Sequence, residues 1–251
     1  MPAWVWFTIA GVAAVVGAGL LVADHGRRTA HSRERRRWAS LRGWQFVESD
    51  PVLPDRWHHG GIGQGGARVA TDLVSGRLFT AESRRLVHAF DLVQNGKVAT
   101  VIVAVQRHET HSGAVVEMWL PSVPSPSDAG LESLGPVGVR DAFVTDLSVT
   151  RRMITPELVG ALDEIGDDIP VAWFEEDWVL AAAPAGATPA RLERLLRALG
   201  EVADQLDGGG TDGGDTDGGE GGSGGGDGGG DASAEPPWPW SGTGAPDRHT
   251  S

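Results

Sequence analysis

The feature that most constrains this chain is an apolar run close to its N-terminus. Residues 3–23 read AWVWFTIAGVAAVVGAGLLVA and contain no charged side chain. A helix of this length measures about 32 Å, close to the roughly 30 Å hydrocarbon core of a bilayer. Because a helix satisfies its own backbone hydrogen bonds, it is the form that such a segment can adopt in lipid. The run therefore predicts one transmembrane helix over residues 3–23 that anchors the protein in a membrane.

The charges on either side of this run predict its orientation. Residues 24–37 contain six arginines against Asp24 and Glu34, whereas residues 1–3 carry no basic side chain. By the positive-inside rule, the N-terminus lies outside the cell membrane and the C-terminal domain is cytoplasmic. One alternative is a cleaved signal peptide, although such peptides carry basic residues before the apolar run. Another alternative places the folded body outside, in the envelope.

Composition divides the rest of the chain into three regions. Residues 24–42 predict a basic juxtamembrane helix with Trp38 and Leu41 on its apolar side. Residues 43–206 are long enough for one globular domain with its own core. Residues 207–251 begin with a tract of Gly and Asp that offers no large apolar side chain to bury. This tail is predicted to be disordered.

The domain is predicted to be α+β, with a mainly antiparallel sheet and a few helices. Valine-rich, partly alternating segments predict strands over residues 44–48, 67–74, 86–93, 97–106, 114–120 and 142–147. Asn95-Gly96 predicts a two-residue type I′ hairpin, because both central positions need positive φ. The later pattern predicts a helix over 156–165, a hairpin of strands 169–174 and 178–183, and a closing helix from Thr188. The apolar stripe of that closing helix consists of Leu192, Leu195, Leu196, Leu199, Val202 and Leu206.

Several blocks of this sequence are similar to those of a known family. The blocks read WASLRGWQFVESDPVLPDRW, GRLFTAES, VHAFDLV, ITPELVGAL and VAWFEEDWVLAAAP. Together with the N-terminal span and the Arg-rich segment, they resemble an actinobacterial family of single-pass membrane-anchored proteins with no established function. The first block matches the family pattern at Arg42, Gly43, Trp44, Asp50, Pro51, Arg56 and Trp57. The resemblance covers most of residues 1–205 and implies no catalytic residue.

A glycine-rich segment satisfies a nucleotide-binding pattern only by its letters. Residues 61–66 read GIGQGG, which fits G-x-G-x-x-G. A dinucleotide site needs a strand before these glycines and a helix after them. Here RWHH precedes the segment and a predicted strand follows it, so we interpret residues 61–66 as a loop.

Histidines and acidic residues raise the question of a metal site or a catalytic site. The residues concerned are His58, His59, His88, His108 and His111, with Asp72, Asp91 and Glu109 as acidic neighbours. Their spacing does not require a metal site, so we interpret them as solvated or hydrogen-bonded histidines, with a metal site as the alternative. The acidic pairs Glu175-Glu176 and Asp167-Asp168 lie at predicted turns and are interpreted as solvated. The sequence therefore assigns no catalytic, cofactor-binding or metal-binding residue, and predicts no cofactor.

The chain offers two candidate contacts with other proteins. Near its end it carries a stiff, apolar cluster that contains P-x-x-P and is a candidate partner-binding motif, with chance composition as the alternative: Pro236, Pro237, Trp238, Pro239 and Trp240. Within the span, small residues recur at the spacing that permits a homodimer: Ala10, Ala14 and Ala18, and Ala13 and Gly17. A net charge of −13 excludes nucleic acid as an expected partner of the soluble part. The chain has no cysteine, which excludes disulfides and thiol chemistry.

Two functional hypotheses follow from these observations. The first is a membrane-tethered cytoplasmic interaction or scaffolding domain, contacting membrane lipid through its span. The second is a membrane-anchored, hydrolase-like enzyme whose site would be built from His58, His59, Asp72, His88 and Asp91. The enzyme hypothesis requires these side chains to converge in one closed pocket. Five tryptophans are expected to pack in the core instead of binding a ligand: Trp44, Trp57, Trp119, Trp173 and Trp178.

Overall fold

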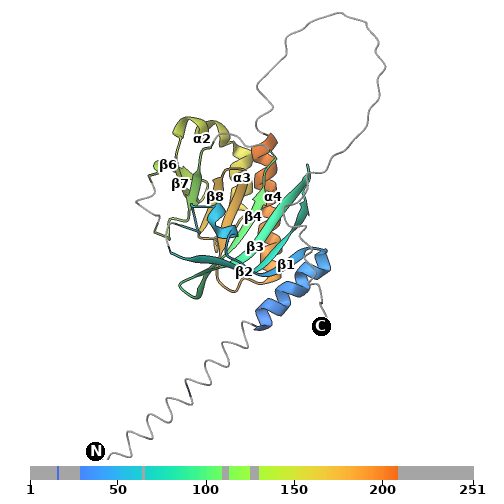
Figure 1. The fold of residues 1–251 in the computed structure, drawn as a ribbon. Helices are drawn as coiled ribbons and strands as arrows, with labels where there is room; N and C mark the ends of the chain where they lie inside the picture. Colours follow the sequence, from blue (N-terminus) through green and yellow to red (C-terminus); the bar gives the residue numbers. More distant parts are fainter. Residues whose placement is uncertain (1–15, 17–28, 64–65, 109–112, 125–129, 209–251) are drawn as a thin grey trace, which may run out of the picture. The chain divides into compact units, whose positions relative to one another are not determined.

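The computed structural model describes residue 16 and residues 29–63, 66–108, 113–124 and 130–208 (Figure 1). These residues belong to one unit, built on a large antiparallel sheet with helices against it. The α+β fold class predicted from the sequence is confirmed.

The two ends of the chain carry predictions that this structure does not reach. Apart from Val16, the predicted span over residues 3–23 lies outside the described residues, and so do residues 209–251 of the predicted tail. Among the residues that are described, no helix combines the length and the apolar character needed to cross a membrane.

Nine strands form one sheet in the described part of the chain, in the order β1-β2-β3-β4-β9-β8-β5-β7-β6, and all neighbours are antiparallel. The strands are β1 Gln45–Asp50, β2 Arg68–Phe79, β3 Arg84–Gln94, β4 Lys97–Gln106, β5 Val116–Trp119, β6 Glu132–Val137, β7 Arg140–Val144, β8 Val171–Glu175 and β9 Trp178–Ala183. The helical elements are a helix over residues 29–42, the 3-10 helix η1 Leu53–Arg56, α2 Leu147–Met153, α3 Pro156–Asp163 and α4 Pro189–Gly208. The late hairpin β8–β9 therefore lies in the middle of the sheet, beside β4.

The turn between β3 and β4 has the geometry that its sequence predicts. Asn95 and Gly96 have φ angles of 51° and 74°, and Gln94 pairs directly with Lys97. Asparagine and glycine accept positive φ at lower cost than other residues. The predicted two-residue hairpin is confirmed.

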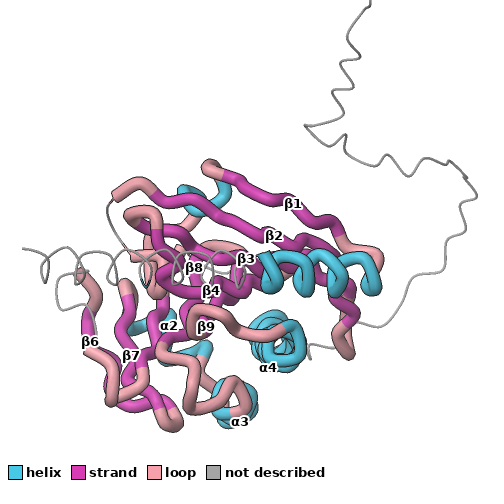
Figure 2. Tube along the Cα trace, turned by 90° about the horizontal axis from the view of Figure 1, so that it is seen from below, coloured by secondary structure: helices cyan, strands magenta, loops and turns pink. Residues whose placement is uncertain are grey.

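The two faces of the sheet are covered by different parts of the chain. Against one face pack α3, α4 and the helix over residues 29–42 (Figure 2). Trp38 and Ala39 of that helix share a core cluster with α4. Against the other face, Trp57 and Ile62 from the segment around η1 cover a second core cluster. We call these the helix face and the tryptophan face. Because both faces are covered, β9 is buried along its whole length and reads as an apolar run.

The closing helix α4 matches its predicted pattern. All six positions of its apolar stripe are buried: Leu192, Leu195, Leu196, Leu199, Val202 and Leu206. Burial of each such side chain stabilises the fold by about 1.5–3 kcal/mol. The helix continues through Gly208, just past the predicted end of the domain.

One predicted strand is shorter than expected because a helix follows it. The strand predicted over residues 142–147 ends at Val144. The side chain of Asp146 accepts hydrogen bonds from the amides of Ser148 and Val149 and so caps α2, which the sequence analysis did not predict.

Strand β6 was also not predicted. It contains Gly135 and Pro136, which are both unusual inside a strand and weaken the pattern. It pairs only with β7, at the edge of the sheet, where such residues are tolerated.

The helix over residues 29–42 is placed differently from its prediction. Trp38 is buried as expected, but Leu41 is 78% exposed, so its predicted place on the apolar side is wrong. The centre of the inward side is Arg35, which is fully buried. Leu41 lies about 120° around the helix from Arg35, which turns it away from the sheet.

Candidate functional site

The five residues considered for an enzyme do not meet in one pocket. Asp72 and Asp91 contact the helix over residues 29–42, on the helix face. His88 packs among the aromatic rings of the tryptophan face, and His58 and His59 lie in the loop after η1. In the described part of the chain, no group of three or more His, Asp or Glu side chains could hold a metal ion. The hydrolase-like alternative therefore has no support.

The two aspartates instead fasten the helix over residues 29–42 to the sheet. The buried Arg35 places its Nη1 atom 2.6 Å from Oδ1 of Asp91 on β3 and donates to the backbone oxygen of Asp72 at 3.4 Å. Nε2 of His31 lies 3.1 Å from Nη2 of Arg35. The hydroxyl of Ser32 donates to Oδ1 of Asp72 at 2.7 Å. This set of contacts, which we call the Arg35 junction, joins the segment that follows the predicted span to the folded body.

The backbone of β2 is irregular where it takes part in the Arg35 junction. Asp72 has a φ of 50°, and the pairing with β3 shifts between Thr71 and Val74. A bulge of this kind re-aims backbone and side-chain groups out of the regular ladder. Burial raises the pKa of Asp91, and the nearby Arg35 guanidinium opposes that rise.

On the tryptophan face, two buried glutamates hold the loop that carries the histidines. Glu175 of β8 accepts hydrogen bonds from the amides of His58 at 2.8 Å and His59 at 3.2 Å. Its Oε2 also accepts from the indole of Trp173 at 3.3 Å. Glu175 is only 6% exposed, so the interpretation of this residue as solvated is wrong.

The second glutamate, Glu117 of β5, binds the next part of the same loop. Its Oε1 accepts from the amide of Gly60 at 2.8 Å and lies 3.1 Å from Nδ1 of His59. Its Oε2 accepts from the indole of Trp119 at 2.8 Å. Gly60 has a φ of 58°, and a Cβ there would come within 2.2 Å of the Trp173 ring. The two carboxylates thus hold the loop to the sheet.

His88 packs among aromatic side chains on the tryptophan face. Its Nδ1 lies 2.8 Å from the hydroxyl of Ser75, and its ring stacks on Trp178 with centroids 5.1 Å apart. Burial, and then the charge of Arg56, lower the pKa of His88 to about 4. The imidazole is therefore neutral near pH 7.

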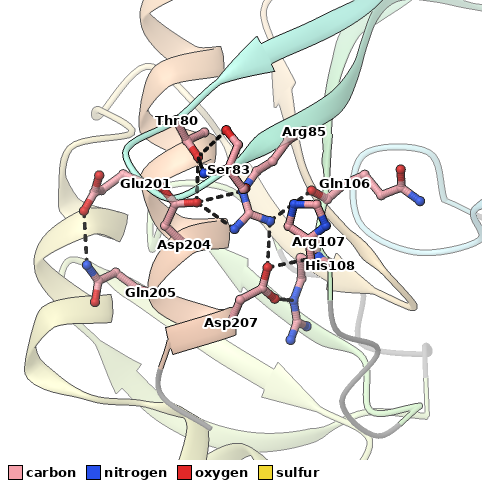
Figure 3. A network of polar contacts seen from close by, with 10 residues as sticks. All are labelled: Thr80, Ser83, Arg85, Gln106, Arg107, His108, Glu201, Asp204, Gln205 and Asp207. Carbon is pink, nitrogen blue, oxygen red and sulfur yellow. Dashed lines mark hydrogen bonds and ion pairs between the residues drawn. The ribbon is translucent and has the colours of Figure 1, made fainter. Parts of the chain in front are cut away.

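A third polar cluster fastens the end of α4 to β3 and β4 (Figure 3). The buried Arg85 donates from Nε to Asp204 and from Nη1 to Asp207, both at 2.7 Å. The hydroxyl of Thr80 donates to Asp204 at 2.9 Å, and Nε of Arg107 donates to Asp207 at 3.4 Å. We call this set the Arg85 clamp.

The Arg85 clamp also stabilises the negative charges at the C-terminal end of α4. Carboxylates near the C-terminal end of a helix are repelled by its dipole. Burial raises the pKa of Asp207, but the hydrogen bond from the His108 amide and the charge of Arg85 outweigh it and hold the pKa below its usual range.

Among the concavities on the surface of the described residues, a groove and a smaller hollow are considered as binding sites. A groove of about 590 Å³ runs between α3 and α4, lined by Glu157, Ala161, Glu164, Arg194, Arg197, Ala198 and Glu201. A polar hollow of about 200 Å³ lies beside the Arg85 clamp, lined by Arg84, Arg85, Leu86, Gln106, Arg107, His108 and Asp177. Neither is lined by any of the five residues of the enzyme hypothesis.

The residues that organise these clusters were not singled out from the sequence. Arg35 belongs to a run of arginines that looks uniform, and Arg85 follows Arg84 in the same way. Glu117 carried a weak signal, since it is a charged residue inside the apolar strand segment VVEMW.

Comparisons with known proteins agree with this architecture. A family model described as "Trehalose monomycolate transport factor TtfA" matches residues 2–208. The chain is 28% identical over 201 residues to trehalose monomycolate transport factor A of Mycolicibacterium smegmatis, covering 80% of this chain and 69% of that protein. The crystal structure of the mycobacterial trehalose monomycolate transport factor A, TtfA, has a similar fold, with a TM-score of 0.62 at 24% identity, over 70% of this chain and 94% of that one.

These matches refine the resemblance drawn from the sequence blocks. The family is actinobacterial, as the resemblance implied, but the expectation of a family without an established function is wrong, because its members are named for a transport process. Since the family model spans nearly all of the chain up to the end of α4, the chain belongs to the trehalose monomycolate transport factor TtfA family.

Proposed function

We propose that this protein is a membrane-anchored, non-enzymatic factor in the transport of trehalose monomycolate. The match of the family model to residues 2–208 carries the proposal, because it includes both the apolar N-terminal run and the whole described body. The arrangement of the polar side chains adds support. The buried acids and arginines hold helices and loops in place, and the candidate catalytic residues are divided between two faces of the sheet.

The finer features of the proposal come from the sequence. Residues 3–23 form the span, the N-terminus lies outside, and the folded body and the tail after residue 208 are cytoplasmic. The tail acts as a tether, and residues 236–240 near its end bind a protein partner of the transport machinery. The body acts as a scaffold that keeps such a partner close to the membrane.

The direct test is to deplete this protein in its own bacterium and follow trehalose monomycolate by pulse labelling and extraction. We expect labelled trehalose monomycolate to remain in the cell membrane fraction and to fall in the outer layer. The full chain should restore delivery, whereas a chain lacking residues 1–28 should not, because it is no longer anchored. Unchanged delivery after depletion would contradict the proposal.

A matched variant separates a scaffold from an enzyme. The His58 side chain is 61% exposed, and Gln can still donate to Glu175, so we expect His58→Gln to leave the fold intact. A scaffold carrying this substitution should restore delivery fully. Loss of delivery by a stably folded His58→Gln protein would favour the enzyme class instead.

The orientation is tested separately. Reporters that are active only in the cytoplasm or only outside are fused after residue 208. Cytoplasmic activity is expected, and activity outside would place the body in the envelope.

A further inference from the structure

The helix over residues 29–42 has an outward side that the fold does not use. Its inward side is centred on the buried Arg35, with Trp38 and Ala39 beside it. Successive residues of a helix are about 100° apart, so Arg33 and Arg37 lie almost directly opposite Arg35. Both are exposed.

The arginines on this outward side also differ from the others in their partners. The remaining arginines in the described part of the helix each face an acid: Arg35 with Asp91, Arg36 with Glu48 and Arg42 with Glu193. Arg33 and Arg37 form no ion pair with a described residue. Glu34, which is also exposed and stands next to Arg33, is the acid nearest to them along the helix, but neither arginine pairs with it. No ion pair with a described residue therefore compensates their charge, in a chain whose net charge is −13.

An exposed leucine extends the same side of the helix. Leu41 follows Arg37 by four residues and is 78% exposed. Residues at i, i+4 and i+8 of a helix lie on one side of it. Basic residues combined with an exposed large apolar residue are typical of helices that lie in a membrane interface.

We infer that Arg33, Arg37 and Leu41, the lipid stripe, rest on anionic phospholipid headgroups beside the span. The inference depends on the proposed anchor, since it requires residues 3–23 to be in the membrane. Residues 24–28 can extend by at most about 17 Å, so the start of the helix stays close to the bilayer surface. Uncompensated arginines at this position match a negatively charged lipid surface.

The Arg35 junction gives this contact a consequence for the whole body. Arg35 and the lipid stripe lie on opposite sides of one helix, so a helix docked on lipid through the stripe presents Arg35 away from the bilayer. Because Arg35 is fastened to β2 and β3, the sheet is then held at a fixed orientation above the membrane.

The absence of cysteine from the natural chain makes a direct test simple. We would introduce Leu41→Cys, and as a matched control Phe79→Cys, because Phe79 is 76% exposed at the end of β2. Each full-length protein is labelled with an environment-sensitive fluorophore and reconstituted in phosphatidylcholine vesicles, with or without 30% phosphatidylglycerol. Iodide reports exposure to water, and brominated lipid reports contact with the bilayer.

With phosphatidylglycerol, the label at position 41 should be shielded from iodide and quenched by brominated lipid, whereas the label at position 79 should show neither effect. Each arginine near an anionic surface strengthens binding about fivefold. Adding Arg33→Gln and Arg37→Gln should therefore return most of the exposure at position 41, as should omitting phosphatidylglycerol.

The outcomes distinguish the lipid stripe from the anchor. If the vesicles float with the protein but both labels are equally accessible to iodide, the lipid inference is overturned and the anchor stands. If the protein does not float with the vesicles, both are overturned. Shielding of position 41 from iodide without quenching by brominated lipid would assign the stripe to protein contact, and would also overturn the inference.

Discussion

The two faces of the sheet bury acidic side chains in different ways. At the Arg35 junction on the helix face, Asp91 lies against a buried guanidinium. On the tryptophan face, Glu117 and Glu175 accept hydrogen bonds from loop amides and indole N–H groups. Removing either side chain of a buried ion pair destabilises the fold strongly, because the other side chain remains buried and charged. Backbone amides cannot be removed by substitution, so the tryptophan face is expected to tolerate single changes better.

The largest effect should come from breaking the Arg35 junction. Asp91→Ala leaves the fully buried Arg35 without its acidic partner and should lower the free energy of unfolding by about 3–5 kcal/mol. Chemical denaturation followed by tryptophan fluorescence measures this loss. Arg35→Met combined with Asp91→Leu should recover most of it, since no charge is then buried. A loss below about 1 kcal/mol for the single variant would show that the pair is solvated.

The next largest effect is a pH dependence of stability that we expect from the tryptophan face. The pKa of His88 is lowered to about 4 in the fold, from 6.5. Its stabilising contribution is present above pH 6.5 and is lost as the pH falls from 6.5 towards 4, because the unfolded chain then binds a proton that the folded protein excludes. The full loss is about 3 kcal/mol. In His88→Gln, the slope of the unfolding free energy against pH between pH 4 and 6.5 should fall by the amount that corresponds to about one bound proton. An unchanged slope would assign the pH dependence to other groups.

A smaller effect is expected from one acid of the tryptophan face. Glu117→Gln keeps the size of the side chain and one acceptor oxygen, but turns an NH₂ group towards donors. The variant should lose about 1–3 kcal/mol of unfolding free energy. If denaturation shows a loss as large as that of Asp91→Ala, the proposed difference between the two faces is wrong.

The smallest effect is expected at an exposed ion pair formed by the neighbour of Arg35. Arg36 follows Arg35 directly, but it pairs with Glu48 on the exposed surface. Exposed pairs contribute about 0–1 kcal/mol. Arg36→Gln should therefore be almost neutral under the same denaturation conditions. A loss similar to that of Asp91→Ala would mean that the helix is held by its surface charges.

Local patterns predicted the elements whose cause is local. The Asn95-Gly96 turn follows from the φ preferences of two residues, and the buried stripe of α4 follows from helical spacing. Strand β6 was missed because Gly135 and Pro136 carry no strand preference, and its pairing with β7 decides its form.

The polar clusters depend on partners that the sequence does not bring together. Glu175 looked like a turn residue because its loop partners, His58 and His59, lie far away in the chain. Arg35 and Arg36 look alike in the sequence, and only the position of the helix on the sheet separates them. The place of β9 beside β4 is decided by long-range pairing in the same way.

The Arg85 clamp sets an order of events during synthesis. Arg85 is made early, on β3, but Asp204 and Asp207 belong to the last turns of α4. Before those turns leave the ribosome, Arg85 has no acidic partner, and the part of the helix face that α4 covers is open to water. The middle of the sheet also cannot form before β9, which lies between β4 and β8, has been synthesised. The predicted anchor at the start of the chain can therefore enter the membrane while the body is still open, and the ribosome must reach the end of α4 before the body closes.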